Sequence, residues 1–444
     1  MPLLRRLGVR DAALIVMGGI VGSGIFRNPS VVAKFVPSGV LVMLVWIAGG
    51  AIALLGAGIF AELAARRPHD GGLYAYMRDA FHPSLAFMYG WTLLLVSQSG
   101  GMAAAAVTFA GYVSPSPVWQ RVLSVAAIAV FTAINALGVR QGASTQNLFM
   151  LLKIAAIGGF VVVGLFAPHA TDAAGMVPAF AGGSALAAMG LAMVPVLFAY
   201  SGWQTSSFMS AELKEPAKTL PRGLIAGVVA VVVLYLAVNL VSLHALGIHG
   251  LAGTDAPASD IAALALGPVG RNVMIVVVAL STLGFLSNQI LTSPRVYFQM
   301  AADGTFFRFL ARVNAKTHAP VMAIVLQGAV AIAIALVGLY DWILNYVTSV
   351  DYVFFGLSAL ALIVFRNRDR RDPAAPQPGF TMPGHPWTTG LFLVIAWSIV
   401  ADVMVGDPKT AWGLGILATG LPVYFIFAHY RAKATERSLS PGRK

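Results

Sequence analysis

The sequence predicts an all-α protein that crosses a membrane twelve times. Three observations lead there: an apolar composition, apolar runs of spanning length, and an uneven placement of positive charge. Of the 444 residues, 58% are hydrophobic and only 10% are charged, and the mean hydropathy is +0.80. A soluble domain could not bury that much apolar surface, so the composition is that of a polytopic helical membrane protein.

Apolar runs long enough to span a bilayer recur between charges and turn residues. Within a bilayer each run is expected to be helical, because its backbone groups must find partners inside the same segment. The first run continues past Val40 without a small-residue cleavage site, so we expect it to be a first span and not a removable signal. The predicted spans are 11–36, 39–62, 82–112, 119–138, 145–167, 184–211, 223–246, 266–294, 320–338, 342–365, 387–406 and 410–430.

Positive charge gives the orientation. Most of the 29 Lys and Arg residues fall in the loops that share one side with both chain ends, so both termini are expected in the cytoplasm. The formal charge of +12 is then a topology signal with some attraction for anionic lipid. It does not indicate a nucleic-acid partner, because basic and aromatic residues do not interleave in polar stretches.

The first and the sixth runs are each interrupted in the middle. Residues 17–26 read Met-Gly-Gly-Ile-Val-Gly-Ser-Gly-Ile-Phe, and residues 194–204 contain a proline followed by Ser-Gly. Each glycine costs a helix about 1 kcal/mol. Unwound backbone persists in a bilayer only where it lines a cavity or binds a ligand. The alternative is that these small residues only let neighbouring helices pack closely.

The two interruptions occupy corresponding places if the chain contains two copies of a five-span unit. Because five is odd, the second copy enters the membrane from the opposite side, as in inverted-repeat transporters with a site at the midplane. The predicted units are a first repeat at 1–168, a second at 184–365, two additional spans at 387–430, and a basic cytoplasmic tail at 431–444.

Several motifs together resemble one family. Gly-Ser-Gly-Ile-Phe at 22–26 and Phe-Ala-Tyr-Ser-Gly-Trp at 198–203 are similar to the amino acid–polyamine–organocation transporters, nearest their L-type and alanine-serine-cysteine exchanger branch. Further matches are Tyr-Gly-Trp at 89–91, Ala-Glu-Leu-Lys-Glu-Pro at 211–216, Ser-Pro-Arg-Val-Tyr at 293–297 and Pro-Gly-His-Pro-Trp at 383–387. The resemblance implies a leucine-transporter-like fold of five-plus-five inverted repeats, unwound first and sixth helices, and secondary transport of amino acids.

A zwitterionic α-amino acid fits the two interruptions. Free amides at the start of the outer half-helix favour a carboxylate, and the last carbonyls of the inner halves favour an ammonium group. The resemblance adds Phe198 as a lid on the outer side, whereas ordinary packing is its alternative role. The predicted substrate-binding residues are Ile20, Gly22, Ser23, Gly24, Phe198, Ala199 and Ser201.

Lys153 is a lysine inside the fifth span, where insertion costs about 2.5–3.5 kcal/mol. It marks function by default, although its side chain could instead extend to the cytoplasmic surface. The resemblance implies that Lys153 occupies the place of a sodium ion, near the carbonyls around Gly18 and the hydroxyl of Ser281. Sodium coupling is therefore not expected, while exchange and proton-coupled uptake both stay open.

Two further residues are candidates for gating or coupling. Tyr235 in the seventh span matches a tyrosine that relatives use to hold substrate or gate the inner path, with packing as the alternative. Asp351 in the tenth span could pair with a cationic group, carry a proton or line a vestibule. Ser201 narrows the pocket beside the ammonium position, which favours small neutral L-amino acids. A cationic amino acid or a polyamine is the alternative substrate, with Asp351 as its anchor.

The sequence lacks the residues that an enzyme, an ATP-driven transporter or a channel would need. No clustered His, Asp and Glu set at membrane depth indicates an enzyme, no phosphate loop indicates direct ATP use, and too few spans carry a polar stripe for a channel. With no cysteine, neither a Cys-ligated metal nor a disulfide-linked partner subunit is expected, and no cofactor is implied. The Ala, Gly and Arg content suggests a bacterial protein of the inner membrane.

Overall fold

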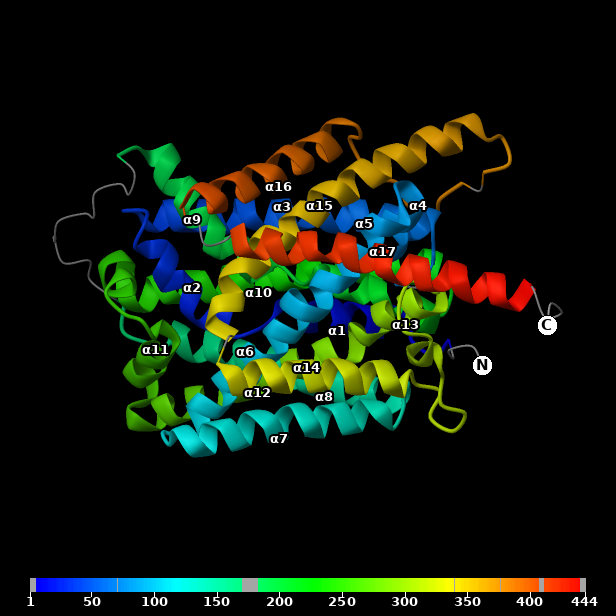
Figure 1. Ribbon diagram of the computed structural model, residues 1–444. Coiled ribbons are helices and arrows are strands. Elements are labelled where there is room, and N and C mark those ends of the chain that lie inside the picture. The colour runs from blue at the N-terminus through cyan, green and yellow to red at the C-terminus, as the bar shows by residue number, and fades with distance from the viewer. Residues whose placement is uncertain are drawn as a thin grey trace.

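The computed structural model of the chain is an elongated bundle of helices (Figure 1). It describes residues 5–69, 71–169, 183–338, 340–375, 377–406 and 411–439. Within this part of the chain no β-strand occurs, and extended backbone pairs at a single isolated bridge between Leu7 and Leu213. The predicted tail at 431–444 falls partly outside these residues, and its described part continues the last helix.

The twelve predicted apolar runs coincide with helices of the structure. Three short helices, α4, α11 and α13, lie in the connections between those runs. In chain order the helices are α1 (Val9–Ile20), α2 (Gly24–Ala33), α3 (Gly39–Arg66), α4 (Leu73–Ala80), α5 (Pro83–Thr92), η1 (Leu93–Ser97), α6 (Gln98–Val113), α7 (Pro117–Ala136), α8 (Val139–Leu165), α9 (Ala185–Tyr200), η2 (Trp203–Glu212), α10 (Pro216–Ala252), α11 (Pro257–Leu266), α12 (Pro268–Thr292), α13 (Pro294–Ala302), η3 (Arg308–Ala311), α14 (Val321–Val337), α15 (Tyr340–Arg371), α16 (Trp387–Gly406) and α17 (Ala411–Leu439).

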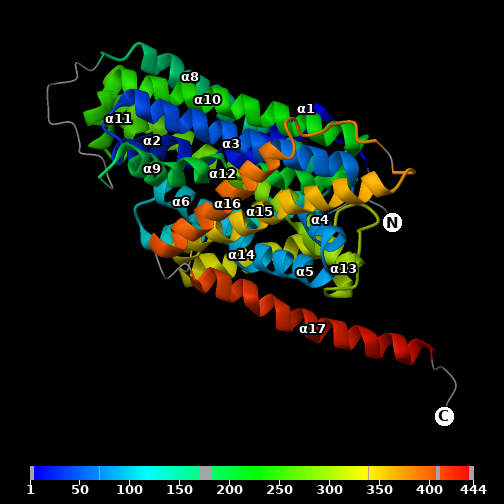
Figure 2. The ribbon, with the colours of Figure 1, turned by 90° about the horizontal axis from the view of Figure 1, so that it is seen from above.

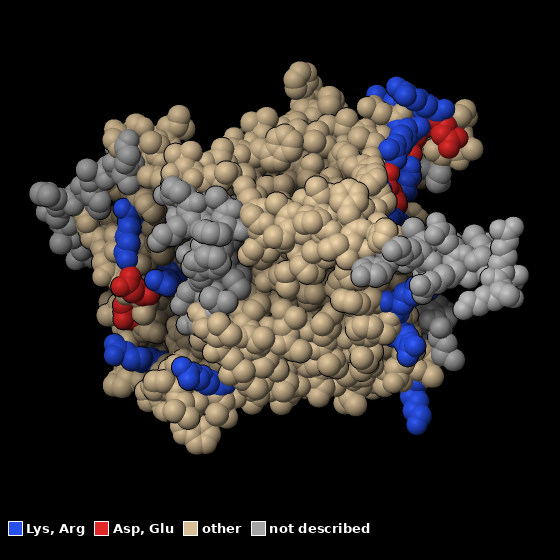
Figure 3. Space-filling view, viewed as in Figure 1, with Lys and Arg blue, Asp and Glu red and all other residues tan. Residues whose placement is uncertain are grey.

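The surface and the helix lengths are those of an integral membrane protein. Nine helices of the described chain are long and apolar enough to cross a membrane, and the bent pair α1 and α2 makes ten if it counts as one span. Lys and Arg gather at the two ends of the bundle, and the broad middle of the face in Figure 3 is uncharged. An uncharged band between two charged ends matches the hydrocarbon core and its two interfaces. The count of twelve spans stays a prediction.

The helices run roughly along one axis, and the described chain begins and ends at the same end of the bundle (Figures 1 and 2). At the centre, α10 packs along α1 and α3, while α12 packs along α6 and α8. Helix α17 lies on the outside against α5, and Figure 2 shows it along one edge. The interruptions in the first and sixth runs therefore lie inside the bundle, surrounded by the longer helices.

Buried ion pairs near the bundle end join helices that are far apart in sequence. Glu62 on α3 accepts hydrogen bonds from Nε of Arg366 on α15 at 2.8 Å and from the Met382 amide at 2.6 Å. Arg295 on α13 pairs with Glu212 at the end of η2, with 3.2 Å between nitrogen and oxygen. Pairing is required because a lone buried charge is strongly destabilising.

Candidate functional site

The chain leaves the helical conformation between α1 and α2 and again between α9 and η2. Helix α1 ends at Ile20 and α2 begins at Gly24, with an angle of 49° between them. Helix α9 ends at Tyr200, after which Ser201 is extended and Gly202 has a φ of 109°. We call these two places, together with the helix ends that lead into them, the first break (residues 19–23) and the second break (residues 199–202).

The two breaks lie against each other, backbone to backbone. A Cβ added at Gly202 would lie 2.0 Å from the carbonyl oxygen of Gly19, and one added at Gly19 would lie 2.5 Å from the carbonyl oxygen of Gly202. No real Cβ tolerates such distances, and the φ of Gly202 is also one that other residues rarely adopt. Glycine at both positions is therefore what allows the two chain segments to meet.

Tyr235 on α10 joins the two breaks from behind. Its hydroxyl lies 3.3 Å from the carbonyl oxygen of Ile20 and 3.3 Å from that of Ala199, and it can donate its proton to either. The ring is buried and packs against Trp46 and Tyr200, with centroid distances of 5.7 and 5.1 Å. The residue is thus both packed and hydrogen-bonded, and it does not line the cavity described below.

Lys153 on α8 holds the first break from another side. Its Nζ donates a hydrogen bond of 2.6 Å to the carbonyl oxygen of Val21, and the residue is only 2% exposed. The hydroxyl of Ser281 on α12 donates to the next carbonyl, that of Gly22, at 3.1 Å. The contact was expected at carbonyls near Gly18, and the hydrogen bond goes instead to Val21, three residues further along the chain. The alternative in which the lysine extends to the surface does not fit this burial.

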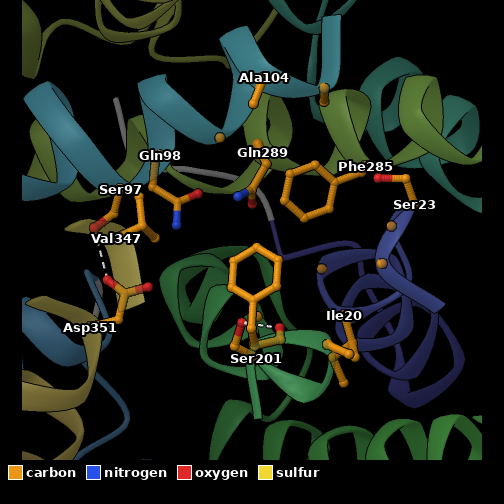
Figure 4. Close-up of a pocket in the computed structure, with 18 of the residues that line it drawn as sticks. Ile20, Ser23, Ser97, Gln98, Ala104, Ser201, Phe285, Gln289, Val347 and Asp351 are labelled. Carbon is orange, nitrogen blue, oxygen red and sulfur yellow. Dashed lines mark hydrogen bonds between the residues drawn. The ribbon is translucent and has the colours of Figure 1, made fainter. Parts of the chain in front are cut away.

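A cavity of about 190 Å³ opens between the breaks and helices α6, α12 and α15 (Figure 4). All seven predicted substrate-binding residues line it, and Asp351 lines its far wall. Lys153, Ser281 and Tyr235 do not reach the cavity, since they bind the backbone of the breaks from outside it. The predicted residues therefore separate into a lining group and a supporting group.

The breaks give the cavity two electrostatic ends. In the described part of the chain the amides of Gly22, Ser23 and Gly24 have no hydrogen-bond acceptor, and they stand at the positive start of α2. Ile20 at the end of α1 and Ala199 near the end of α9 line the same cavity, and these carbonyl ends of the helices carry the opposite partial charge. One end can bind an anionic group and the other a cationic group of the same small molecule.

The wall opposite the breaks is polar. There Ser97 donates a hydrogen bond of 2.8 Å to Oδ1 of Asp351 (Figure 4). Gln98 also lines this wall, and its Oε1 accepts a hydrogen bond of 2.7 Å from Ser293. The buried Oε1 of Gln289 has no hydrogen-bond partner among the described residues. This wall therefore offers acceptors to a bound side chain.

Sequence reasoning missed several residues of this wall. Ser97, Thr282, Phe285 and Gln289 line the cavity, although none of them was predicted to do so. A polar residue inside an apolar run is the available signal for three of them, and Ser97 also ends the π-helical turn η1, a feature frequent at functional sites. Phe285 carries no such signal.

Phe198 is exposed to the cavity and not packed in the core. Its residue surface is 39% exposed, whereas its neighbours Leu197 and Ala199 are buried. Its ring shares the cavity lining with that of Phe285, so the two aromatic rings supply an apolar surface beside the polar ends. The role of Phe198 as an outer lid stays a prediction from the family resemblance.

Comparison with known proteins identifies the family. A profile of the amino acid permease family matches residues 7–427. The chain is 30% identical to the Asc-type amino acid transporter 1 of Mus musculus over 452 residues, which covers 97% of this chain and 82% of that protein. It is 28% identical to the b(0,+)-type amino acid transporter 1 of Mus musculus over 454 residues, covering 100% and 92%.

A bacterial relative is similar along nearly its whole length. The serine/threonine exchanger SteT of Bacillus subtilis (strain 168) is 27% identical over 436 residues, which covers 95% of this chain and 97% of that protein. The family and these relatives transport amino acids, so the chain is a transporter and not an enzyme. The chain belongs to the amino acid permease family, within the amino acid–polyamine–organocation superfamily, on its L-type and Asc-type branch.

Proposed function

We propose that this protein moves small neutral L-amino acids across the membrane by alternating access, through sodium-independent exchange or proton-coupled uptake. The observation that carries the proposal is the cavity between the two breaks, whose free amides and carbonyl ends suit the two charges of an α-amino acid. Because backbone groups do the binding, no buried side-chain charge is needed to hold the common part of every substrate.

Substrate placement follows from the two ends of the cavity. The carboxylate lies at the amides of Gly22, Ser23 and Gly24, and the ammonium lies at the carbonyls of Ile20, Phe198, Ala199 and Ser201. The side chain then points toward the opposite wall, beside the rings of Phe198 and Phe285. This arrangement rests on the lining residues and on helix polarity.

Small neutral substrates are favoured by the second break and by the relatives. The hydroxyl of Ser201 donates a hydrogen bond of 2.7 Å to the carbonyl oxygen of Phe198, so it stands at the ammonium position and takes up room there. One relative is named a serine/threonine exchanger, and another an Asc-type amino acid transporter. Acceptors on the opposite wall also suit a substrate hydroxyl such as that of serine or threonine.

Sodium independence is supported by the position of Lys153. Its ammonium group already supplies a cation to the carbonyl of Val21, inside the bundle and 2.6 Å away. A second cation at the same carbonyl would be repelled, since like charges at short distance in a poorly solvated site are costly. Transport is therefore expected to proceed without sodium.

The proposed fold is a leucine-transporter-like arrangement of twelve spans with unwound first and sixth helices. Ten spans come from the nine long apolar helices and the bent pair α1 and α2. The remaining two of the proposed twelve are α14, which has 17 residues, and the apolar residues 413–429 of α17. A 17-residue helix is about 26 Å long, near the lower limit for a span. The two five-span units are 1–168 and 184–365, followed by two spans at 387–430.

The proposed location is a bacterial inner membrane with both termini in the cytoplasm. The excess of Lys and Arg in loops on the side of the chain ends supports that orientation. The chain has no cysteine, so it cannot be joined to a partner subunit through a disulfide of its own.

Reconstitution in liposomes tests the proposal. Uptake of labelled serine, threonine, alanine, glycine, leucine and arginine is measured while internal amino acid, the pH gradient and sodium are varied one at a time. Fast uptake of the small neutral members without sodium is expected. Acceleration by internal substrate indicates exchange, and acceleration by an inward proton gradient indicates symport. Uptake that strictly requires sodium, or that favours leucine over serine, would contradict the proposal.

A cationic substrate is the second candidate, favoured by one observation. The carboxylate of Asp351 lines the cavity, and its hydrogen-bond partner among the described residues is the neutral hydroxyl of Ser97. A cationic amino acid or polyamine would supply a positive charge to pair with this carboxylate. Arginine or putrescine uptake that is lost in the Asp351→Asn variant, with serine uptake retained, would establish this candidate.

A further inference from the structure

A second cavity, of about 460 Å³, lies at the bundle end where the described chain begins. It shares no lining residue with the cavity between the breaks. We call it the basic cavity. Its lining residues come from the segment before α1, from the first turn of α1, from the first turns of α8 and from the second residue after η2: Arg6, Leu7, Asp11, Arg140, Ala143, Ser144, Asn147 and Lys214.

The backbone fixes two of its cations on one rim. The amides of Arg6 and Leu7 donate to the carbonyl oxygen of Glu212 at 2.9 and 3.0 Å, and the amide of Lys214 donates to the carbonyl oxygen of Leu7 at 2.9 Å. This short pairing holds Arg6 and Lys214 next to each other. Arg140 approaches from the start of α8, the third element of the wall.

The charge of the basic cavity is uncompensated. Arg6, Arg140 and Lys214 form no ion pair with any acid in the part of the chain that the structure describes. The one carboxylate of the wall, Asp11, accepts from the Gly8 amide at 2.9 Å and from Asn147 Nδ2 at 2.7 Å. Three cations against one engaged carboxylate leave an excess of two positive charges facing the cavity.

The depth of the basic cavity is that of the lipid headgroups. Arg140 is the second residue of α8, a spanning candidate of 27 residues. Such a helix is about 40 Å long, against a hydrocarbon core of about 30 Å, so its first residues extend into the headgroup layer. Basic pockets between spanning helices at this depth are known to suit anionic headgroups.

We propose that the basic cavity binds a phosphate group. The guanidinium of Arg140 can pair with two phosphate oxygens, and Arg6 and Lys214 supply the remaining charge. The phosphate can come from the headgroup of an anionic phospholipid or from free inorganic phosphate. Once bound, it joins the segment before α1 and the end of η2 to α8, the helix whose Lys153 holds the first break, and so stabilises the arrangement of the breaks.

The test compares lipid retention and thermal unfolding in three full-length proteins. These are the parent, the double variant Arg140→Gln and Lys214→Gln, and a matched control, Arg121→Gln with Arg271→Gln. The control arginines are exposed and lie near the starts of α7 and α12, at the opposite end of the bundle. Native mass spectrometry measures binding of phosphatidylglycerol against phosphatidylcholine, and unfolding is followed with added inorganic phosphate.

Phosphatidylglycerol should bind the parent and the control protein in preference to phosphatidylcholine. Each removed cation should weaken binding about fivefold, which gives about twenty-fivefold for the double variant. Stabilisation of the parent by inorganic phosphate without a preference for phosphatidylglycerol would support the phosphate site with free phosphate as its source. Equal binding in all three proteins, or no binding of either probe to the parent, would overturn the proposal. If the double variant does not fold, Arg6→Gln replaces it with the same expected direction.

Discussion

Replacing Gly202 by alanine is the sharpest perturbation of the two facing breaks. The added Cβ would lie 2.0 Å from the carbonyl oxygen of Gly19, whereas ordinary contact begins at 3.4 Å. The two chain segments must therefore separate by about 1.4 Å, or the backbone of Gly202 must rotate. Keeping the φ of 109° costs an alanine about 1–2 kcal/mol, so this strain adds to the steric pressure on the backbone at this position.

Either the separation of the two segments or the rotation of Gly202 would displace the backbone groups at the cavity. A misplacement of about 1 Å can reduce the rate of a process that depends on exact positioning by about a hundredfold. We therefore expect the ratio of maximal rate to apparent KM for serine uptake to fall about a hundredfold in Gly202→Ala. The free energy of unfolding should fall by at least the strain, about 1–2 kcal/mol.

The assay is counterflow of labelled serine in liposomes, with size-exclusion chromatography to check that each variant is folded. Gly190→Ala is the matched control, because Gly190 lies on the same helix, α9, and an added Cβ there meets no atom within 4 Å. The control should transport like the parent. A folded Gly202→Ala protein with the parent's apparent affinity would refute the argument that the breaks must meet to form the site.

Three further substitutions test the groups that hold the site. Lys153→Met removes the charged donor to the carbonyl of Val21. A charged hydrogen bond is worth about 1.5–3 kcal/mol, so transport should slow at least tenfold. An unchanged rate under every gradient would contradict this. Tyr235→Phe removes one long hydrogen bond and should raise the apparent KM about three- to tenfold with little change in melting temperature, whereas a large melting shift would indicate a packing role. Arg295→Met breaks the buried ion pair with Glu212 and should cost about 3–5 kcal/mol of stability, measured by thermal unfolding.

Sequence was informative where backbone chemistry decides the outcome. The all-helical membrane class and the family are confirmed. Both could be predicted because the apolar runs, the charge placement and the family motifs extend along most of the chain. Glycine and serine in mid-span indicated where to look, and the structure has helix boundaries at Ile20, Gly24 and Tyr200. The number of spans and the inverted repeat stay predictions.

Sequence was less informative about partners across the bundle. The sequence placed Lys153 inside a span, yet its acceptor, the carbonyl oxygen of Val21, depended on how α8 packs against the first break. Ser97 and Gln289 come from helices far apart in the chain, and only packing brings them to one wall. The basic cavity likewise depends on the backbone bridge between Leu7 and Leu213, which no local sequence pattern predicts.

The central claim is that paired helix breaks bind both charges of an amino acid, and competition by charge-deleted analogues tests it most directly. Inhibition of labelled serine uptake is compared for L-alanine, L-alanine methyl ester, which lacks the carboxylate, and N-acetyl-L-alanine, which lacks the ammonium. Removing a charged partner that backbone groups hold should weaken binding by about 1.5–3 kcal/mol, or roughly tenfold to a hundredfold. The account predicts that L-alanine inhibits strongly and that both analogues inhibit at least tenfold more weakly. Inhibition by either analogue with the same potency as L-alanine would contradict it.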